Sequence, residues 1–148
     1  MERALNPFEI LFQEAMNDPA READFFGWVS RQVFYVPCQL TGGFATSADS
    51  STRWAARRVE VDAQTRLRLK AFSSQGQGGV QTLVPFFSDL SRFEKWSLPE
   101  PQGQYAELPG RTFFALVPPQ AAALLNPGSE RFSKWFAPDE VRRVLSSS

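Results

Sequence analysis

The side chains that most often perform catalysis are scarce in this sequence of 148 residues. It contains no histidine and a single cysteine, Cys38. Imidazole zinc sites, Ser-His-Asp triads and Cys-His dyads are therefore excluded, because each of them needs a histidine. Carboxylates are available at Asp89, Glu94, Glu100 and Glu107, but their spacing assigns no acid and base pair. We expect no catalytic residue, no metal site and no cofactor, and we expect Cys38 to be a small buried residue.

Two glycine-containing stretches suggest anion binding through backbone N–H groups. The cluster at residues 76–79 is followed by no Walker lysine and no helix, so a hairpin tip is the better interpretation. The second stretch, residues 126–129, reads Asn-Pro-Gly-Ser and is either a tight turn or a small-anion site. Ser88, Asn126 and Ser129 are therefore candidate ligand-binding residues of a small-ligand-binding or enzymatic domain, which is the alternative function.

Three aromatic side chains stand close together near the end of the sequence, at Phe132, Trp135 and Phe136. They follow the turn at 126–129 and precede a helix start at 138–140, so the sequence predicts that they lie in a loop. Large rigid rings are typical anchors of protein interfaces, and they also fold back on a core beside a helix start. Binding of a protein partner through these rings is one hypothesis, and a lid on the core is the other.

The charges of the chain balance, with 16 Lys and Arg against 16 Asp and Glu. A net charge of zero argues against nucleic-acid binding, which depends on an excess of cations, and against binding to anionic membranes. The run at residues 66–70 places three cations on one strand face. With Arg53, Arg57 and Arg58 it suits an acidic partner, but a solvated face that prevents edge pairing has the same pattern.

The length indicates one domain over residues 1–148, with a helical arm at 1–32 and an α/β core at 33–148. Fourteen Phe and four Trp predict an aromatic core. A single cysteine suits a reducing compartment, and no signal-peptide pattern is present. No stretch approaches about 18 consecutive apolar residues. We therefore expect a cytoplasmic protein without a membrane span.

The stretch at residues 82–96 changes from a short apolar run to an apolar spacing of about three, at Leu90, Phe93 and Trp96. This change predicts a strand that leads directly into a helix. Ser88 is the expected N-cap of that helix, and Asp89 follows as a negative charge in its first turn.

β-Branched and aromatic residues predict a strand at 33–36, and alternation predicts strands at 59–63 and 67–71. A fourth strand is expected at 80–87, where the chain returns from the glycine-rich tip. All four are expected in one sheet, and the last two are expected to pair antiparallel across a tip at 73–79. Pro37 either ends the ladder of the first strand or forces an edge or a bulge. The predicted fold class is α/β of the α+β kind: a single compact domain with a mixed, mainly antiparallel sheet packed with short helices.

A helix start is predicted at Asn6-Pro7-Phe8-Glu9, where Asn6 caps, Pro7 takes the first helical position and Glu9 completes a capping box. Further helices are expected at about 19–32, 111–117 and 138–145. Short strands are expected at 105–108 and 121–125.

Three motifs follow one another along the chain: Val36-Pro37, the strand end at 83–88 with its helix, and the apolar-Asn-Pro-Gly-Ser turn at 124–129 before Pro138-Asp139-Glu140. In this order they resemble the N-terminal domain of the SseB, or enhanced serine sensitivity, family of bacterial proteins. The resemblance covers roughly residues 24–145. Two features differ: full-length members often carry a C-terminal domain that these 148 residues do not include, and residues 41–52 are unusually rich in Ser and Thr.

The resemblance implies a compact mixed α/β domain of the bacterial cytoplasm, with no known reaction and no catalytic residues to transfer. Related domains are associated with secretion systems, so an accessory role in secretion is one expectation. Our main functional hypothesis is a non-enzymatic domain that acts by binding a protein partner. The identity of that partner and the oligomeric state are left open by the sequence.

Overall fold

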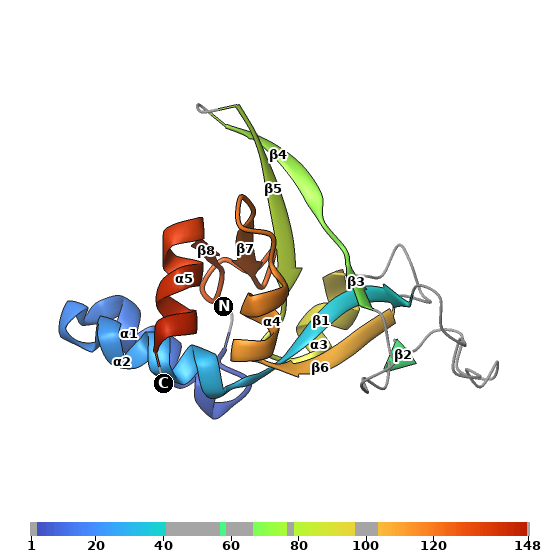
Figure 1. Ribbon diagram of the computed structural model, residues 1–148. Helices are drawn as coiled ribbons and strands as arrows, with labels where there is room; N and C mark the ends of the chain where they lie inside the picture. Colours follow the sequence, from blue (N-terminus) through green and yellow to red (C-terminus); the bar gives the residue numbers. More distant parts are fainter. Residues whose placement is uncertain (1–2, 41–56, 59–66, 77–78, 97–103, 148) are drawn as a thin grey trace.

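Two four-stranded sheets and five α-helices are formed by the part of the chain that the structure describes, residues 3–40, 57–58, 67–76, 79–96 and 104–147 (Figure 1). The computed structural model is thus an α+β fold with short helices, which confirms the expected fold class.

Sheet pairing is mixed and mainly antiparallel. The first sheet has the order β2 (Arg57–Arg58), β6 (Gln104–Pro109), β1 (Val33–Leu40), β3 (Leu67–Leu69). The second has the order β4 (Phe72–Gly76), β5 (Gly79–Phe86), β7 (Ala122–Leu125), β8 (Lys134–Phe136). Among these strands the parallel pairs are β2–β6 and β5–β7. The strands predicted at 105–108 and 121–125 are confirmed as β6 and β7.

The helices lie where their capping and apolar patterns predicted them. They are α1 (Pro7–Asn17), α2 (Glu22–Arg31), α3 (Leu90–Trp96), α4 (Gly110–Leu116) and α5 (Pro138–Ser146). A 3-10 turn at Pro19–Arg21 precedes α2 and starts at the capping Asp18, whose carboxylate accepts the N–H of Ala20 at 3.1 Å. No helix within the described ranges is long and apolar enough to cross a membrane.

The prediction that the four strands share one sheet is wrong. β3 pairs with β1, whereas the residues that follow it form β4, which pairs with β5. The chain passes from one sheet to the other across Lys70 and Ala71. Alternation of apolar residues shows which face of a strand is buried, but it does not specify the partner strand. The strand expected at 59–63 lies outside the described residues.

A hairpin at the glycine cluster is confirmed, but its strands are longer than expected. Residues 73–76, expected in the tip, belong to β4, which pairs antiparallel with β5 from Phe72 opposite Leu83 to Gly76 opposite Gly79. In Figure 1 this hairpin extends well away from the helices.

Pro37 marks the point at which β1 changes partners. Residues 33–37 pair with β6, and residues 38–40 pair with β3. The ladder with β6 ends at Pro37, as expected for a residue that cannot donate a backbone hydrogen bond, but the strand itself continues. The carbonyl of Pro37 accepts a bond from the N–H of Lys70 at 3.2 Å.

The corner at residues 82–96 joins the two sheets. Tyr35 of β1 and Phe87 exchange two backbone hydrogen bonds of 2.9 Å. The end of β5 therefore continues into a bridge with the first sheet, and α3 begins immediately afterwards.

The N-cap of α3 is Asp89 and not Ser88, so this prediction was wrong. The Oδ1 atom of Asp89 accepts the N–H of Ser91 at 3.0 Å and its hydroxyl at 2.7 Å. Ser88 is only 2% exposed, and its hydroxyl is bonded to side chains from other elements. Both residue types cap helices, and the sequence does not show which of them faces the interior.

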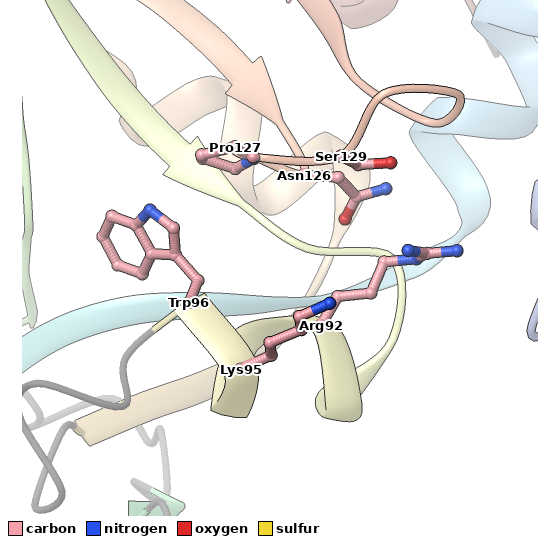
Figure 2. Close-up of a pocket in the computed structure, with 7 residues that line it drawn as sticks. Arg92, Lys95, Trp96, Asn126, Pro127 and Ser129 are labelled. Atoms are coloured by element: carbon pink, nitrogen blue, oxygen red, sulfur yellow. The ribbon is translucent and has the colours of Figure 1, made fainter. Parts of the chain in front are cut away.

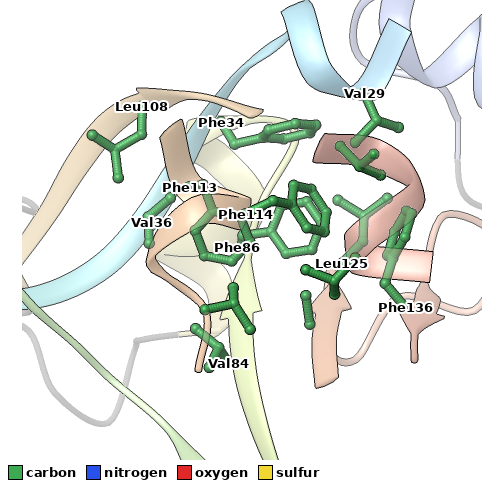
Figure 3. Packing of buried hydrophobic residues seen from close by; sticks show 14 of the residues in the cluster. Val29, Phe34, Val36, Val84, Phe86, Leu108, Phe113, Phe114, Leu125 and Phe136 are labelled. Carbon is green, nitrogen blue, oxygen red and sulfur yellow. The ribbon is translucent and has the colours of Figure 1, made fainter. Parts of the chain in front are cut away.

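Phenylalanine rings form the centre of the main core (Figure 3). The ring of Phe86 lies 4.6 Å from Phe113, 4.8 Å from Phe34, 5.3 Å from Phe114 and 5.8 Å from Phe136, centroid to centroid. Two of these pairs, Phe86 with Phe34 and Phe86 with Phe114, meet edge to face, a geometry that adds about 0.5–1.5 kcal/mol per pair beyond burial. One side chain of β5 thus holds β1, α4 and β8 around it.

The two N-terminal helices contribute to the same core. Phe8 and Phe12 of α1 are buried, as are Phe25, Phe26 and Val29 of α2. Residues 1–32, expected as a helical arm, therefore pack directly on the sheets and on the helices that cover them.

Gly110 allows α4 to approach α2 closely. Its N–H donates to the carbonyl of Gln32 at 2.7 Å. A Cβ at this position would lie 1.8 Å from the carbonyl oxygen of Val29, so only glycine fits without moving the backbone.

Phe93→Ala is expected to lower the free energy of unfolding by about 3–5 kcal/mol, because the ring is buried between Phe87 and Tyr105. Urea denaturation measures the change. Lys95→Ala, at an exposed position of the same helix, is the control and should shift stability by less than about 0.5 kcal/mol. Equal stability of the two variants would show that α3 has a different orientation.

Candidate functional site

A buried ion pair joins α1 to α3. Glu9 is fully buried, and its carboxylate accepts two bonds from Arg92, from Nε at 2.7 Å and from Nη2 at 2.8 Å. The same carboxylate accepts the hydroxyl of Ser88 and the N–H of Leu5, the latter at 2.8 Å. Two-pronged pairing of this kind is the strongest form of carboxylate recognition by arginine.

The start of α1 places Glu9 in this position. The side chain of Asn6 caps the helix by accepting the N–H of Glu9 at 2.9 Å, and Pro7 occupies the first helical position. The expected capping box is only half formed, because the Glu9 carboxylate turns inward to Arg92 instead of bonding the Asn6 N–H. Asn6 also donates to the carbonyl of Ser88 at 2.7 Å, which fixes the helix start against the end of β5.

Asn126 connects the same point to the end of β7. Its side-chain oxygen accepts the N–H of Ser88 at 3.0 Å, and its amide donates to the Ser88 hydroxyl and to the carbonyl of Phe132, both at 2.9 Å. Its backbone is left-handed, with φ at 51°, a conformation that asparagine tolerates better than most residues. We name the four side chains of Glu9, Ser88, Arg92 and Asn126 the polar joint.

The polar joint holds four segments together, namely α1, α3 and the ends of β5 and β7, and its buried polar atoms are all hydrogen-bonded. The structure brings two of the candidate ligand-binding residues, Ser88 and Asn126, into direct contact. Ser88 is 2% and Asn126 1% exposed, and every buried side-chain nitrogen or oxygen of the described residues has a partner. The hydroxyl of Ser88 donates to a carboxylate that Arg92 already neutralises, so the geometry suits positioning better than nucleophilic attack.

A pocket of about 110 Å³ opens on the outer side of the polar joint (Figure 2). Its walls are α3 and the turn at residues 126–129, and Ser88 does not line it. Figure 2 shows Trp96 and Pro127 across from each other, with Arg92 and Lys95 along the helix side. The lining residues are Arg92, Lys95, Trp96, Asn126, Pro127, Gly128 and Ser129.

The third candidate ligand-binding residue, Ser129, lies at the rim of this pocket. Its hydroxyl accepts the N–H of Phe132 at 3.0 Å, and its own N–H donates to the carbonyl of Asn126 at 3.0 Å. Gly128 has φ at 87°, which glycine adopts without strain. The sequence 126–129 is therefore a tight turn, and this turn is also one wall of a pocket.

The aromatic cluster is divided between the core and the surface. Phe132 and Phe136 are fully buried, and Trp135 is 44% exposed. Residues 134–136 form strand β8, not a loop, and the pleat of a strand sends neighbouring side chains to opposite faces. Phe136 packs in the main core, and Phe132 lies under the Arg92 guanidinium, 4.7 Å from ring centroid to Cζ.

Cys38 is fully buried. Burial raises the pKa of its thiol from 9.0 to about 11, and the nearby Lys70 cation offsets a smaller part of this effect. A protonated buried thiol is a weak nucleophile, which agrees with the expected role as a small core residue.

Four site residues were missed by sequence reasoning: Glu9 as a buried acid, and Arg92, Lys95 and Trp96 as pocket residues. Glu9 lies 83 positions before its partner Arg92, and a capping-box acid normally faces solvent. The sequence does contain one indication of the pocket: Arg92 and Lys95 are three positions apart in a predicted helix, so they must lie on the same side of it.

Arg92→Met is expected to lower the free energy of unfolding by about 3–5 kcal/mol, because it leaves the buried Glu9 carboxylate without its cation. Adding Glu9→Gln should restore part of this loss, since a neutral amide is less costly to bury. Urea denaturation of both variants provides the measurement. A double variant no more stable than Arg92→Met would contradict this account.

The raised pKa of Cys38 predicts a loss of stability at alkaline pH. Below pH 9 the thiol is protonated in both states. Between pH 9 and about 11 only the unfolded thiol ionises, so the free energy of unfolding should fall by about 2 kcal/mol over this window. Cys38→Ala should lack this component when unfolding is measured from pH 8 to pH 11. Parallel pH profiles of the two proteins would refute the assignment.

Comparison with known proteins gives one match. The sequence model of the family described as SseB protein N-terminal domain matches residues 10–143, a range that includes the whole pocket. Neither the curated proteins nor the solved structures contain a match to this chain. The resemblance inferred from the three motifs is thus confirmed. Because the match extends over more than half of the sequence, the chain belongs to the family of SseB N-terminal domains.

Proposed function

We propose that this domain binds a protein partner on one face of its second sheet and catalyses no reaction itself. The face follows from the register of the strands. Alternate side chains of β5, β7 and β8 lie in the main core, namely Val84, Phe86, Ala123, Leu125 and Phe136. The alternate positions point to the opposite side, which we name the outer face: Phe72, Leu83, Pro85, Ala122, Leu124 and Trp135.

The outer face is apolar at these six positions across the four strands, and towards the hairpin tip it continues with the polar pair Ser74 and Gln81. Leu83 pairs with Phe72 on one side and Ala122 on the other, and Leu124 pairs with Pro85 and Trp135. None of these six side chains carries a charge. Sheets with one solvent-facing side normally alternate apolar and polar residues. Here the central positions Leu83, Pro85 and Ala122 are buried by the protein itself, so the apolar surface open to a partner lies at the two edges of the sheet.

Two aromatic rings of this face are accessible, and this observation carries the proposal. Trp135 is 44% and Phe72 is 37% exposed. They stand on the two edge strands β8 and β4, three strand spacings or about 14 Å apart. The residues between them, Leu83, Pro85 and Ala122, are buried. Rigid aromatic anchors on a well-supported sheet suit a protein interface because little side-chain entropy is lost on binding.

The proposal retains one of the three aromatic residues predicted to bind a partner. Trp135 lies on the outer face, whereas Phe132 and Phe136 support it from the core. Family membership supports the remaining parts of the proposal, which are a bacterial cytoplasmic location and a secretion-associated accessory role.

The pocket beside Asn126 favours a second candidate function, the binding of a small ligand. Its volume of about 110 Å³ is well below the roughly 300–1,000 Å³ that enclose whole small-molecule substrates. It therefore suits one polar group of a larger ligand better than a complete substrate, which places the enzymatic alternative second.

Trp135→Ser is expected to abolish partner capture while the fold remains intact. The partner proteins would be captured from a lysate of the native host on immobilised wild-type and variant domains, and quantified by mass spectrometry. Leu116→Ser is the matched control, because Leu116 is 46% exposed on α4 and is not part of the outer face. Capture of the same proteins in equal amounts by the Trp135 variant would refute the proposed surface.

A further inference from the structure

The pocket beside Asn126 lies at the α3 end of the outer face. Phe87 continues the series of Leu83 and Pro85 on the same side of β5, and the ring of Trp96 packs on it with centroids 5.3 Å apart. Trp96 is 37% exposed and also lines the pocket. Trp96 therefore covers the buried Phe87 at this end of β5 and forms one wall of the pocket, with Pro127 as the opposite wall (Figure 2).

The cations of the pocket differ in what they already bind. The guanidinium of Arg92 is held by the Glu9 carboxylate through Nε and Nη2, so its charge is offset from within the protein. Lys95 also lines the pocket, and within the part of the chain that the structure describes its ammonium group forms no ion pair. No carboxylate is among the described residues that line the pocket. Its uncompensated charge is thus positive and belongs to Lys95.

The size and walls of the pocket define the group that fits. A volume of about 110 Å³ holds a carboxylate with one or two methylene groups. The Trp96 ring and Pro127 offer apolar contact for those methylenes, and Lys95 offers the counter-charge. Phosphate is less suited, because proteins often bind phosphate by two parallel hydrogen bonds from one arginine. In this pocket Arg92 already makes such a pair of hydrogen bonds to Glu9.

One accessible ammonium group holds a free anion only weakly, since an exposed ion pair changes an affinity by less than about tenfold. The carboxylate must therefore be carried by a ligand that gains further contacts nearby. Two exposed rings offer such contacts, Trp96 beside the pocket and Trp135 on the outer face, and a polypeptide is the ligand that can extend from one to the other.

We propose that the pocket receives an aspartate or glutamate side chain of the partner protein, from a segment whose neighbouring apolar side chains rest on the outer face. This inference depends on the proposed protein-binding function and adds the chemistry of the partner. The carboxylate determines which segments bind, and the apolar contacts supply most of the affinity.

Selection from a random 12-residue peptide library displayed on phage tests the inference. The baits are the wild-type domain and the variants Lys95→Glu, Arg142→Glu and Trp135→Ser. Arg142→Glu is the matched charge reversal, since Arg142 is exposed on α5 and does not line the pocket. Circular dichroism confirms that each bait is folded.

The wild-type and Arg142→Glu domains should both select peptides with an Asp or Glu next to large apolar residues. Lys95→Glu should lose this acidic preference and bind a selected acidic peptide about tenfold or more weakly, whereas Lys95→Gln should weaken it about three- to tenfold. Replacing the peptide acid by its amide should remove the difference between wild type and Lys95→Gln.

The outcomes separate this inference from the proposed function. Apolar peptides without acidic enrichment, lost with Trp135→Ser, would overturn the acidic partner and leave the outer face in place. Acidic peptides that bind Trp135→Ser unchanged would support the pocket and overturn the outer face. No enrichment on the wild-type domain would overturn both. Titration with inorganic phosphate is a further arm: saturation of the Trp fluorescence change below about 1 mM would assign the pocket to a free anion and overturn the inference.

Discussion

A carboxylate taken out of water must be neutralised, and the arrangement of this domain depends on how that is done for Glu9. The desolvation cost of a buried acid amounts to several kcal/mol, so Arg92 must reach it with correct geometry. This requirement fixes α1 against α3 although 83 positions separate the two residues. Through Ser88 and Asn126 it also fixes the ends of β5 and β7. The pair adds little net stability compared with apolar residues, but its geometry permits one relative placement of these four segments.

The aromatic core works in the opposite way, because apolar burial has no preferred direction. Phe86 contacts rings from β1, α4 and β8, and these contacts supply cohesion without specifying a register. The polar joint lies at one end of this core, where β5 ends and the chain bridges to the first sheet at Tyr35 and Phe87. The aromatic contacts hold the core together, and the polar joint sets how its segments are oriented. Together they account for two sheets that meet at one corner.

The same polar joint prepares the pocket on its outer side. Arg92 forms part of one wall and is held there by Glu9, while Asn126 begins the other wall and is held by Ser88 and Phe132. A pocket between two fixed walls loses little entropy when a ligand enters it. The buried polar joint thus fixes the backbone of α3, from which Lys95 and Trp96 line the pocket.

Local sequence determined the helices, the short strands β6 and β7 and the α+β class, because caps, proline positions and apolar spacing act over a few residues. It also carried the three motifs by which the SseB family was recognised. Only the tertiary structure decided which strands pair, since alternation specifies a buried face but not a neighbour. It likewise decided that Ser88 faces the interior while Asp89 caps α3, and that Trp135 alone of its aromatic cluster reaches the surface. The partnership of Glu9 with Arg92 could not be read from the sequence, because a long-range ion pair has no periodicity and exists only once the fold has brought its two halves together.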